Sequence, residues 1–500
     1  MKSKLIRSFV GVMAALALLA GAAAADDVAA PGTAKYKLKK VKVTGFEHHV
    51  RLLAWAVVGA DSSVVFALNM EETDVPPSLD IYTLRSFTLN SKGKVGTATD
   101  VLTMTGGRIS QAAACWFAEQ APSPDHGLLL IAYYPEGVSD VGRFAAASFN
   151  ESGKLTSDFE TLLEINAPED MYYQMLWLTA GVRGDVVGVF AGANINESSD
   201  DLYGRRAGEA YFMEVSSTGV LQEPGAADVR LPKGGNYRLF RPYRPAWNGE
   251  SWMVPGVVTL LKRMPYDPRD YVDQIGYQVH VLRVTPDQGG NSFDMRMRKI
   301  ANDRTNIHYP TFVSPVFLPR VSVPPSPTQG GEPLYLLYTH AAPAEGPYIG
   351  SNSKSYTYFY QQISAEGGRM GKRAKFKAAP WFRPYWGTPD RLSYETFSFF
   401  SNYVVLTYGG RVLITHSRSG YYRELHGSRT WQELQLDCYS FDPGSGQVDR
   451  LAGSNYKGKI WSGGPLLRAF GPALRSLNLF RLEGSSGQYH SFYFSKLPGY

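Results

Sequence analysis

The chain has 500 residues, of which 13% are aromatic and 19% are charged, and its formal net charge is +6. The charged fraction is below the roughly 25% typical of soluble domains, and Tyr and Phe are abundant, which excludes a disordered chain. Its 50 glycines show no three-residue period and it has two cysteines, which excludes a collagen-like chain and a disulfide framework.

Residues 1–25 have the pattern of a secretory signal peptide. Three basic residues precede an apolar run, 9–20, that is shorter than the ~20 residues a membrane-spanning helix needs. Small residues lead up to Ala25, so we expect cleavage there and a single mature domain, 26–500, in the periplasm or outside a bacterial cell. No later stretch of 18 uncharged apolar residues predicts a transmembrane segment.

The mature chain begins with a lysine-rich strand, KYKLKKVKV, at residues 35–43. Lysine discourages edge-to-edge association of sheets, so this strand is predicted to be outermost in its sheet. Two inner strands follow, Leu52–Gly59 and Ser62–Met70. Comparable apolar runs recur along the chain at Gly127–Tyr134, Asp185–Gly192, Pro333–His340 and Arg411–Ser417. Such runs are typical of sheets that are covered on both faces.

A second recurring element is a strand, a polar turn with glycine, and another strand. Its copies are Phe87–Val95, Ser148–Leu155, Val215–Leu221, Val284–Phe293, Ile363–Met370 and Tyr439–Val448. Their turn glycines are Gly93, Gly153, Gly219, Gly290, Gly368 and Gly446, which are 60 to 78 residues apart. Tight hairpins favour glycine because it accepts positive φ. A fixed unit with this period predicts four-stranded blades.

The last unit has three strands, Pro465–Phe470, Ser476–Leu482 and Tyr489–Leu497, and is one strand short. Strand 35–43 can supply the fourth, which would close a ring. The sequence therefore predicts an all-β protein and resembles a seven-bladed β-propeller with four antiparallel strands in each blade. Six or eight blades remain open if the long middle units divide differently. It lacks the signatures of named propeller families, such as GH…WD and S-x-D-x-G-x-T-W.

Candidate binding residues are the aromatic and arginine side chains of the long loops, where a rigid scaffold presents variable segments. FRPYR (240–244) and FRPYW (382–386) recur at blade entrances. Such side chains suit protein partners, sugars or anionic groups, and they equally suit stacking that pins the loops. The set is Tyr237, Arg238, Phe240, Arg241, Tyr243, Arg244, Tyr309, Trp381, Arg383, Tyr385, Trp386 and Arg391.

Metal and nucleophile motifs are missing from the sequence, so we expect no catalytic residues and no cofactor. Asn194, Asn196, Ser198 and Asp200 alternate as in a calcium loop, but the first ligands are neutral and no glycine takes the sixth place, which favours a solvated loop. Cys115 and Cys438 lie in apolar strands far apart in the chain and are predicted to be buried free thiols.

These features favour an exported, non-catalytic binding or assembly scaffold that engages a protein or cell-envelope partner through the aromatic and arginine loops. One alternative is a carbohydrate-active propeller enzyme with carboxylates in the central funnel, and another is a structural, surface-layer-like component. Nucleic acid is not expected. Without the signal peptide the chain has 48 basic and 45 acidic residues, and five of the 48 are the lysines of strand 35–43.

Overall fold

The structure, a computed structural model, consists of β-strands, and no helix occurs among the residues that it describes. No helix in this part of the chain could therefore span a membrane. The described residues are 39–46, 49–71, 80–117, 126–135, 140–167, 171–197, 205–216, 219–226, 236–263, 272–287, 292–303, 321–322, 334–340, 357–377, 399–408, 411–423, 430–442, 445, 447–457, 459–461, 466–470, 473–482 and 490–496.

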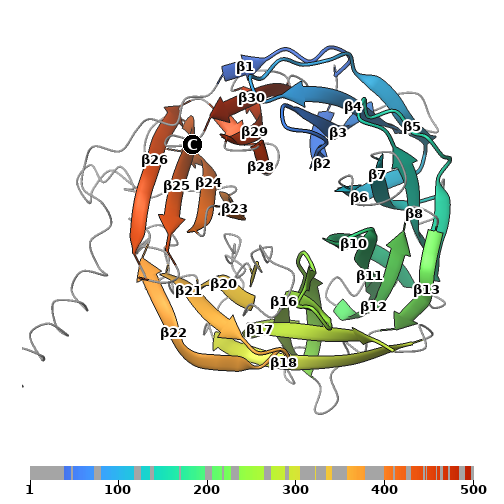
Figure 1. The fold of residues 1–500 in the computed structure, drawn as a ribbon, viewed down its shortest axis with the longest axis vertical. Helices are drawn as coiled ribbons and strands as arrows, with labels where there is room; N and C mark the ends of the chain where they lie inside the picture. The colour runs from blue at the N-terminus through green and yellow to red at the C-terminus, as the bar shows by residue number, and fades with distance from the viewer. Residues whose placement is uncertain are drawn as a thin grey trace, which may run out of the picture.

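Within these ranges the strands form seven antiparallel sheets, which Figure 1 shows arranged around a common centre. The first three, from the centre outward, are β2 (His49–Val57), β3 (Ser62–Glu71), β4 (Ile81–Asn90) and β5 (Thr99–Thr105); β6 (Arg108–Phe117), β7 (His126–Tyr134), β8 (Val141–Phe149) and β9 (Glu160–Asn166); and β10 (Met171–Arg183), β11 (Val186–Glu197), β12 (Arg205–Ser216) and β13 (Gly219–Ala226).

The next three sheets follow the same plan. They are β14 (Asn236–Pro242) with β15 (Ala246–Trp247), β16 (Trp252–Arg263), β17 (Val272–Pro286) and β18 (Phe293–Asp303); β19 (Val321–Ser322), β20 (Leu334–His340), β21 (Thr357–Ile363) and β22 (Arg369–Lys377); and β23 (Phe399–Tyr408), β24 (Arg411–Arg423), β25 (Thr430–Phe441) and β26 (Val448–Lys457). The predicted propeller of four-stranded antiparallel blades is confirmed.

The seventh sheet combines strands from both ends of the described chain. It contains β27 (Lys459–Trp461), β28 (Leu466–Phe470), β29 (Ala473–Leu482), β30 (His490–Lys496) and β1 (Lys39–Val41). Strand β1 pairs with β30, with Lys39 opposite Phe494 and Val41 opposite Phe492. Lys39 and Lys40 are exposed and Val41 is buried, so the described part of the lysine-rich strand takes the outermost position that its composition predicts.

Two sheets have an interrupted innermost strand, which the hydrophobic pattern did not predict. In the fourth sheet β14 pairs with β16 as far as Pro242, and β15 resumes the pairing at Ala246. Pro242 and Pro245 lack the N–H group that a continuous ladder needs. The N–H of Tyr243, between them, still donates to the carbonyl of Pro255 at 2.8 Å. In the seventh sheet β27 and β28 both pair with β29.

The hydrophobic cores of the described residues lie between neighbouring sheets, and each of the first four sheets contributes its two faces to two different cores. On β3, Val65 and Ala67 pack with the seventh sheet, whereas Val64 and Phe66 pack with the second. The rings of Phe66 and Phe149 meet edge to face with centroids 5.0 Å apart. This packing explains the continuous apolar runs, because both faces of the strand are buried. Cys115 in the second sheet and Cys438 in the sixth are buried free thiols, as predicted.

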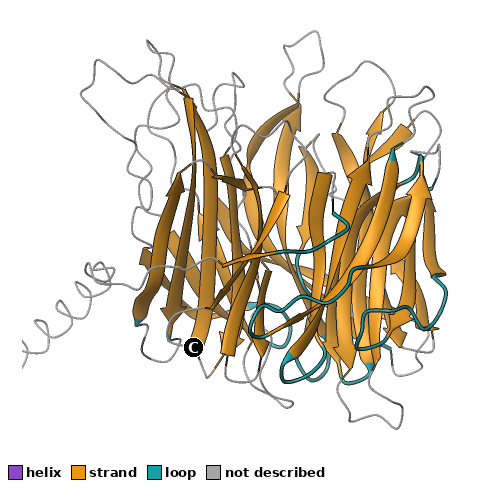
Figure 2. Ribbon diagram, turned by 90° about the horizontal axis from the view of Figure 1, so that it is seen from above, coloured by secondary structure: helices purple, strands orange, loops and turns teal. Residues whose placement is uncertain are grey.

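Figure 2 shows the strands running between the two ends of the ring, with most of the described turns at one end. These turns join first to second and third to fourth strands, and we call this the short-hairpin end. Gly93 and Gly153 adopt φ of 79° and 82° there, as their hairpins predict. The opposite end, where second strands lead to third strands and each sheet to the next, is called the long-loop end.

The hairpin glycines of the later sheets show one difference from the prediction. In the turn that joins β21 to β22, the positive φ belongs to Gly367 (77°) instead of Gly368. The N–H of Gly367 donates to the carbonyl of Ser364 at 2.9 Å, which closes the turn one residue earlier. Gly219 has the expected positive φ, and Gly290 and Gly446 lie outside the described residues.

A polar joint connects the first sheet with the seventh at the short-hairpin end. The Ser91 hydroxyl and N–H both donate to Oδ1 of Asp61, and Arg475 Nε donates to the carbonyl of Ser91 at 2.7 Å. The hydrogen bond from the Ser91 hydroxyl is the main cause that lowers the pKa of Asp61. The joint thus ties two turns of the first sheet to a strand more than 380 residues later.

The contribution of Asp61 to stability is expected to depend on pH. Its folded pKa lies below the unfolded value of ~3.9, so the contribution is present above about pH 4 and is lost as the pH falls through the folded pKa. Urea denaturation of wild type and Asp61→Asn should show a difference in unfolding free energy at pH 7 that shrinks at about pH 3. An equal difference at both pH values would contradict this role.

Candidate functional site

Two arginines stand near the start of neighbouring innermost strands at the long-loop end. Arg51 is the third residue of β2 and Arg108 is the first residue of β6, and β2 lies beside β6. The link before Arg108 is short, because β5 ends at Thr105 and Gly106 turns the chain with a φ of 75°. The fold therefore brings two residues, 57 positions apart, to the same end of the ring.

The electrostatics of this arginine pair, Arg51 and Arg108, are unusual for surface cations. The Arg51 side chain is exposed to solvent, yet burial lowers its pKa and the positive charge of Arg108 lowers it further. Within the described part of the chain, neither guanidinium forms an ion pair with a carboxylate.

Tyr134 forms the aromatic part of this site. It is the last residue of β7, directly opposite Arg108, and it is buried. The guanidinium carbon of Arg108 lies 4.7 Å from the centre of the Tyr134 ring, which is cation–π distance. Burial raises the pKa of Tyr134, and the adjacent Arg108 opposes that rise. The ring therefore fixes the guanidinium of Arg108 without neutralising its charge.

Strand β6 is held in place by side-chain hydrogen bonds to the next sheet. Ser110 Oγ donates to the carbonyl of Leu176 at 2.8 Å, and Gln111 Oε1 accepts from the N–H of Leu178 at 2.7 Å. Both residues adjoin an irregularity in the pairing of β6 with β7, between Ile109 and Gln111. These contacts anchor the strand just beyond Arg108, so the arginine extends from a rigid support.

Only some of the binding residues predicted from the sequence lie in the described part of the chain. Tyr237, Arg238 and Arg241 lie on β14, and Arg244 is exposed just beyond its end. Phe240 is 3% exposed and packs edge to face on Phe190, and Tyr243 packs against the core between the fourth and fifth sheets. The prediction is corrected for Phe240, because a buried core ring cannot line a surface. Those that lie outside the described residues are Tyr309, Trp381, Arg383, Tyr385, Trp386 and Arg391.

The calcium candidate and the carboxylates give no catalytic centre in the described ranges. Asn194 and Asn196 lie on β11, whereas Ser198 and Asp200 fall outside, and the described residues contain no cluster of metal-ligating side chains. Asp61 and Glu366 have lowered pKa values and lie in turns at the short-hairpin end. Neither can donate a proton near the arginine pair at neutral pH.

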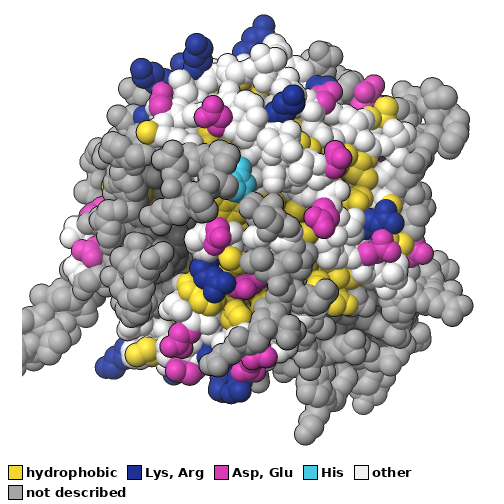
Figure 3. Space-filling model, turned by 45° about the vertical axis from the view of Figure 1, so that its right-hand side comes forward, with side chains coloured by type: hydrophobic (Ala, Val, Ile, Leu, Met, Phe, Trp, Pro, Cys, Tyr) yellow, Lys and Arg dark blue, Asp and Glu magenta, His cyan; other side chains and the backbone are white. Residues whose placement is uncertain are grey.

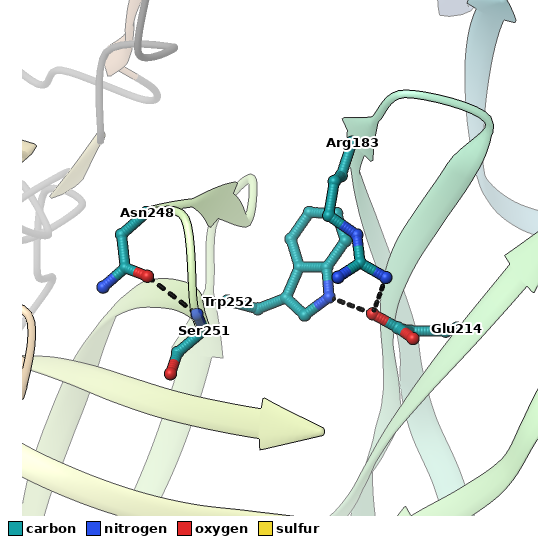
Figure 4. Close-up of polar contacts among 5 residues, drawn as sticks. All are labelled: Arg183, Glu214, Asn248, Ser251 and Trp252. Atoms are coloured by element: carbon teal, nitrogen blue, oxygen red, sulfur yellow. Dashed lines mark hydrogen bonds and ion pairs between the residues drawn. The ribbon is translucent and has the colours of Figure 1, made fainter. Parts of the chain in front are cut away.

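A second polar cluster joins the third and fourth sheets through hydrogen bonds to a buried carboxylate (Figure 4). One oxygen of the buried Glu214 accepts from Arg183 Nη2 at 2.9 Å and from Trp252 Nε1 at 2.6 Å. The Arg183 guanidinium also lies 4.0 Å from the ring centre of Trp247. The cluster joins β10, β12 and β16 at the short-hairpin end, so it connects blades and does not face the arginine pair.

The turn beside this cluster is closed by its own side chains. Asn248 Oδ1 accepts from the N–H groups of Glu250 and Ser251, at 3.0 and 2.7 Å, and Asn248 Nδ2 donates to the carbonyl of Ala365 in the fifth sheet at 3.3 Å. Neither this cluster nor the arginine pair was predicted. No local sequence motif predicts either site, because the residues of each site come from strands that are distant in the sequence.

Comparisons with known proteins give similarity to solved structures alone. No family model matches the sequence and no curated protein matches it. The ectodomain of the parainfluenza virus 5 hemagglutinin-neuraminidase is 8% identical over 99% of this chain and 96% of that chain, with a TM-score of 0.38. Trypanosoma rangeli sialidase in complex with sialic acid is 10% identical over 81% of this chain and 56% of that chain, with a TM-score of 0.34.

A third similar structure is a fructofuranosidase from Schwanniomyces occidentalis complexed with fructosylnystose. It is 8% identical over 95% of this chain and 97% of that chain, with a TM-score of 0.32. The expectation of a non-catalytic scaffold for a protein or envelope partner is contradicted, because the similar propellers are named as enzymes or sugar complexes.

Proposed function

We propose that this protein is an exported, carbohydrate-active propeller that takes a negatively charged sugar at the arginine pair. The observation that carries the proposal is that Arg51 is partly desolvated beside the positive charge of Arg108, and that neither arginine has a carboxylate partner among the described residues. Two like charges in such a place repel each other, and an anion between them removes that repulsion.

The chemistry of the site indicates the ligand class. Guanidinium groups present planar donors that match a carboxylate, and Arg108 is already oriented by the ring of Tyr134. The pair stands at the long-loop end of the innermost strands, and binding residues are common on segments that a rigid scaffold presents there. Sialic acid, the ligand in one of the complexes named above, is an acidic sugar, whereas fructosylnystose is neutral, so the proposal rests on the arginine pair.

The proposal is tested by a matched pair of ligands. We expect the mature protein to bind a short oligogalacturonide, and to bind its methyl-esterified form at least about tenfold more weakly, because esterification removes the negative charge of each carboxylate and keeps the sugar rings. Isothermal titration calorimetry measures both affinities, and chromatography of the same mixtures detects any cleavage. Equal affinity for the two forms, or binding of neutral sugars alone, would contradict an anionic ligand at this site.

A further inference from the structure

The outermost strands of the fourth and fifth sheets are strongly basic. Of the seven charged side chains described on β18 and β22, six are basic and Asp294 is the one acid. The six residues, called the basic rim below, are Arg296, Arg298, Lys299, Arg369, Lys372 and Arg373, and all are exposed. Asp294 forms an exposed ion pair with Arg296 at 3.0 Å, which leaves a clear excess of positive charge.

Arginines from both strands face the space between the two sheets. Met295 and Met297 of β18 pack against the core shared by the third and fourth sheets, so the alternating Arg296 and Arg298 point toward the fifth. The pKa of Glu366, in the turn before β22, is lowered mainly by a hydrogen bond with the Ser364 side chain and further by the positive charges of Arg283 and Arg298.

On β22, the guanidinium carbon of Arg373 lies 4.0 Å from the ring centre of Phe359. Phe359 belongs to the core shared by the fourth and fifth sheets. Arg369, four residues earlier on the same strand, pairs with Ile363, which belongs to the same core, so it shares that face. Cations from two adjacent blades are therefore collected along one stretch of the outer surface.

The fold itself does not require this charge. The equivalent outermost strands β5 and β9 carry Asp100, Glu160 and Glu164 and no basic residue. Figure 3 brings this side of the ring forward, and its right-hand half shows mainly Asp and Glu side chains. Of the other outermost strands, β1 carries Lys39 and Lys40, whereas β18 and β22 together carry six exposed cations. The concentration on two neighbouring blades points to a ligand.

We propose that the basic rim binds an acidic polysaccharide chain and retains it on the protein, while the arginine pair, on other blades, takes the sugar. The choice of a polysaccharide rests on the proposed function, whereas the charge itself is independent of it. A linear polyanion can follow cations spread along two strands, each residue of which advances the chain by ~3.3 Å. A lipid surface is less favoured, because Met370 is the one large hydrophobic side chain exposed among the described residues.

The experiment compares two triple variants that change net charge equally. The first carries Arg296→Glu, Arg369→Glu and Lys372→Glu. Its control carries Lys92→Glu, Lys94→Glu and Lys154→Glu, all exposed in turns of the first two sheets. Binding of the full mature chain to immobilised polygalacturonate is measured across a series of salt concentrations. We expect the first variant to bind at least about tenfold more weakly with a flatter salt dependence, and the control to change less than about twofold.

Further measurements distinguish failure of the basic-rim proposal from failure of the proposed sugar site. The rim variant should keep wild-type affinity for a short oligogalacturonide, and Arg51→Gln should lose that affinity while keeping most binding to the polymer. Equal losses in both triple variants, or absence of polymer binding by the wild type, overturn the proposal. Tighter binding to anionic phospholipid vesicles or to duplex DNA than to polygalacturonate also overturns it. Aggregation of the rim variant with unchanged binding would show that these residues only protect an edge.

Discussion

Replacing Arg51 with glutamine is expected to weaken binding of an acidic oligosaccharide about 10- to 100-fold without reducing stability. A hydrogen bond to a charged group contributes about 1.5–3 kcal/mol, and each 1.4 kcal/mol is a factor of ten in affinity. The guanidinium of Arg51 is desolvated and repelled by Arg108, so its removal relieves an unfavourable interaction in the free protein. Loss of function with retained or increased stability is typical of a binding residue.

Two further variants sharpen this test. Arg51→Lys keeps the charge but loses the planar pair of donors, and we expect an intermediate affinity. Arg143→Gln is the matched control, because Arg143 is also a strand arginine but pairs with Glu164 on the outer part of its sheet. Calorimetry measures affinity and urea denaturation measures stability. Wild-type affinity in Arg51→Gln, or destabilisation comparable to a core substitution, would show that Arg51 has a structural role.

The largest loss of stability is expected from Glu214→Ala, at about 3–5 kcal/mol. The substitution leaves Trp252 Nε1 buried without its acceptor, and it leaves Arg183 stacked between two tryptophans without a counter-charge. Urea denaturation followed by tryptophan fluorescence reports the change directly, because both Trp247 and Trp252 adjoin the cluster.

The exposed pair of Arg143 and Glu164 provides the control for Glu214. Its two side chains are 40% and 41% exposed at a separation of 2.6 Å, so Glu164→Ala is expected to cost less than about 1 kcal/mol. Glu214→Gln retains an acceptor for Trp252 Nε1 and should fall between the two variants. If Glu214→Ala and Glu164→Ala cost the same, the buried cluster does not hold the third and fourth sheets together.

The fold was predictable because its signals are local. Alternating strands, glycine turns and apolar second strands occur within each unit, and the seven sheets match the seven units. The interrupted strand at Pro242 and Pro245 was missed, although proline was a usable signal. The glycine shift from Gly368 to Gly367 depends on hydrogen-bond closure of one turn, which composition does not specify.

The candidate site was far less predictable. Phe240 was selected because FRPYR places an aromatic beside arginines, but strand alternation turns that ring into the core. Arg51 and Arg108 lie near the starts of two strands that have no distinctive sequence pattern. They come close together only because β2 lies beside β6. Arg183 and Glu214 lie on separate strands of the third sheet, and Trp252 meets them from the fourth sheet. Sites that depend on neighbouring sheets have no signature in a single sequence.

The pairing of β1 with β30 has a consequence for the order in which the molecule assembles. Lys39 is paired with Phe494, so β1 cannot complete its pairing until a strand 455 residues later in the chain has been synthesised. The entropic cost of closing such a long loop grows only by about 0.6 kcal/mol for each doubling of its length. The separation in sequence therefore affects when the two strands can pair more than how stable their pairing is. During that interval the exposed charges of Lys39 and Lys40 discourage pairing with other chains.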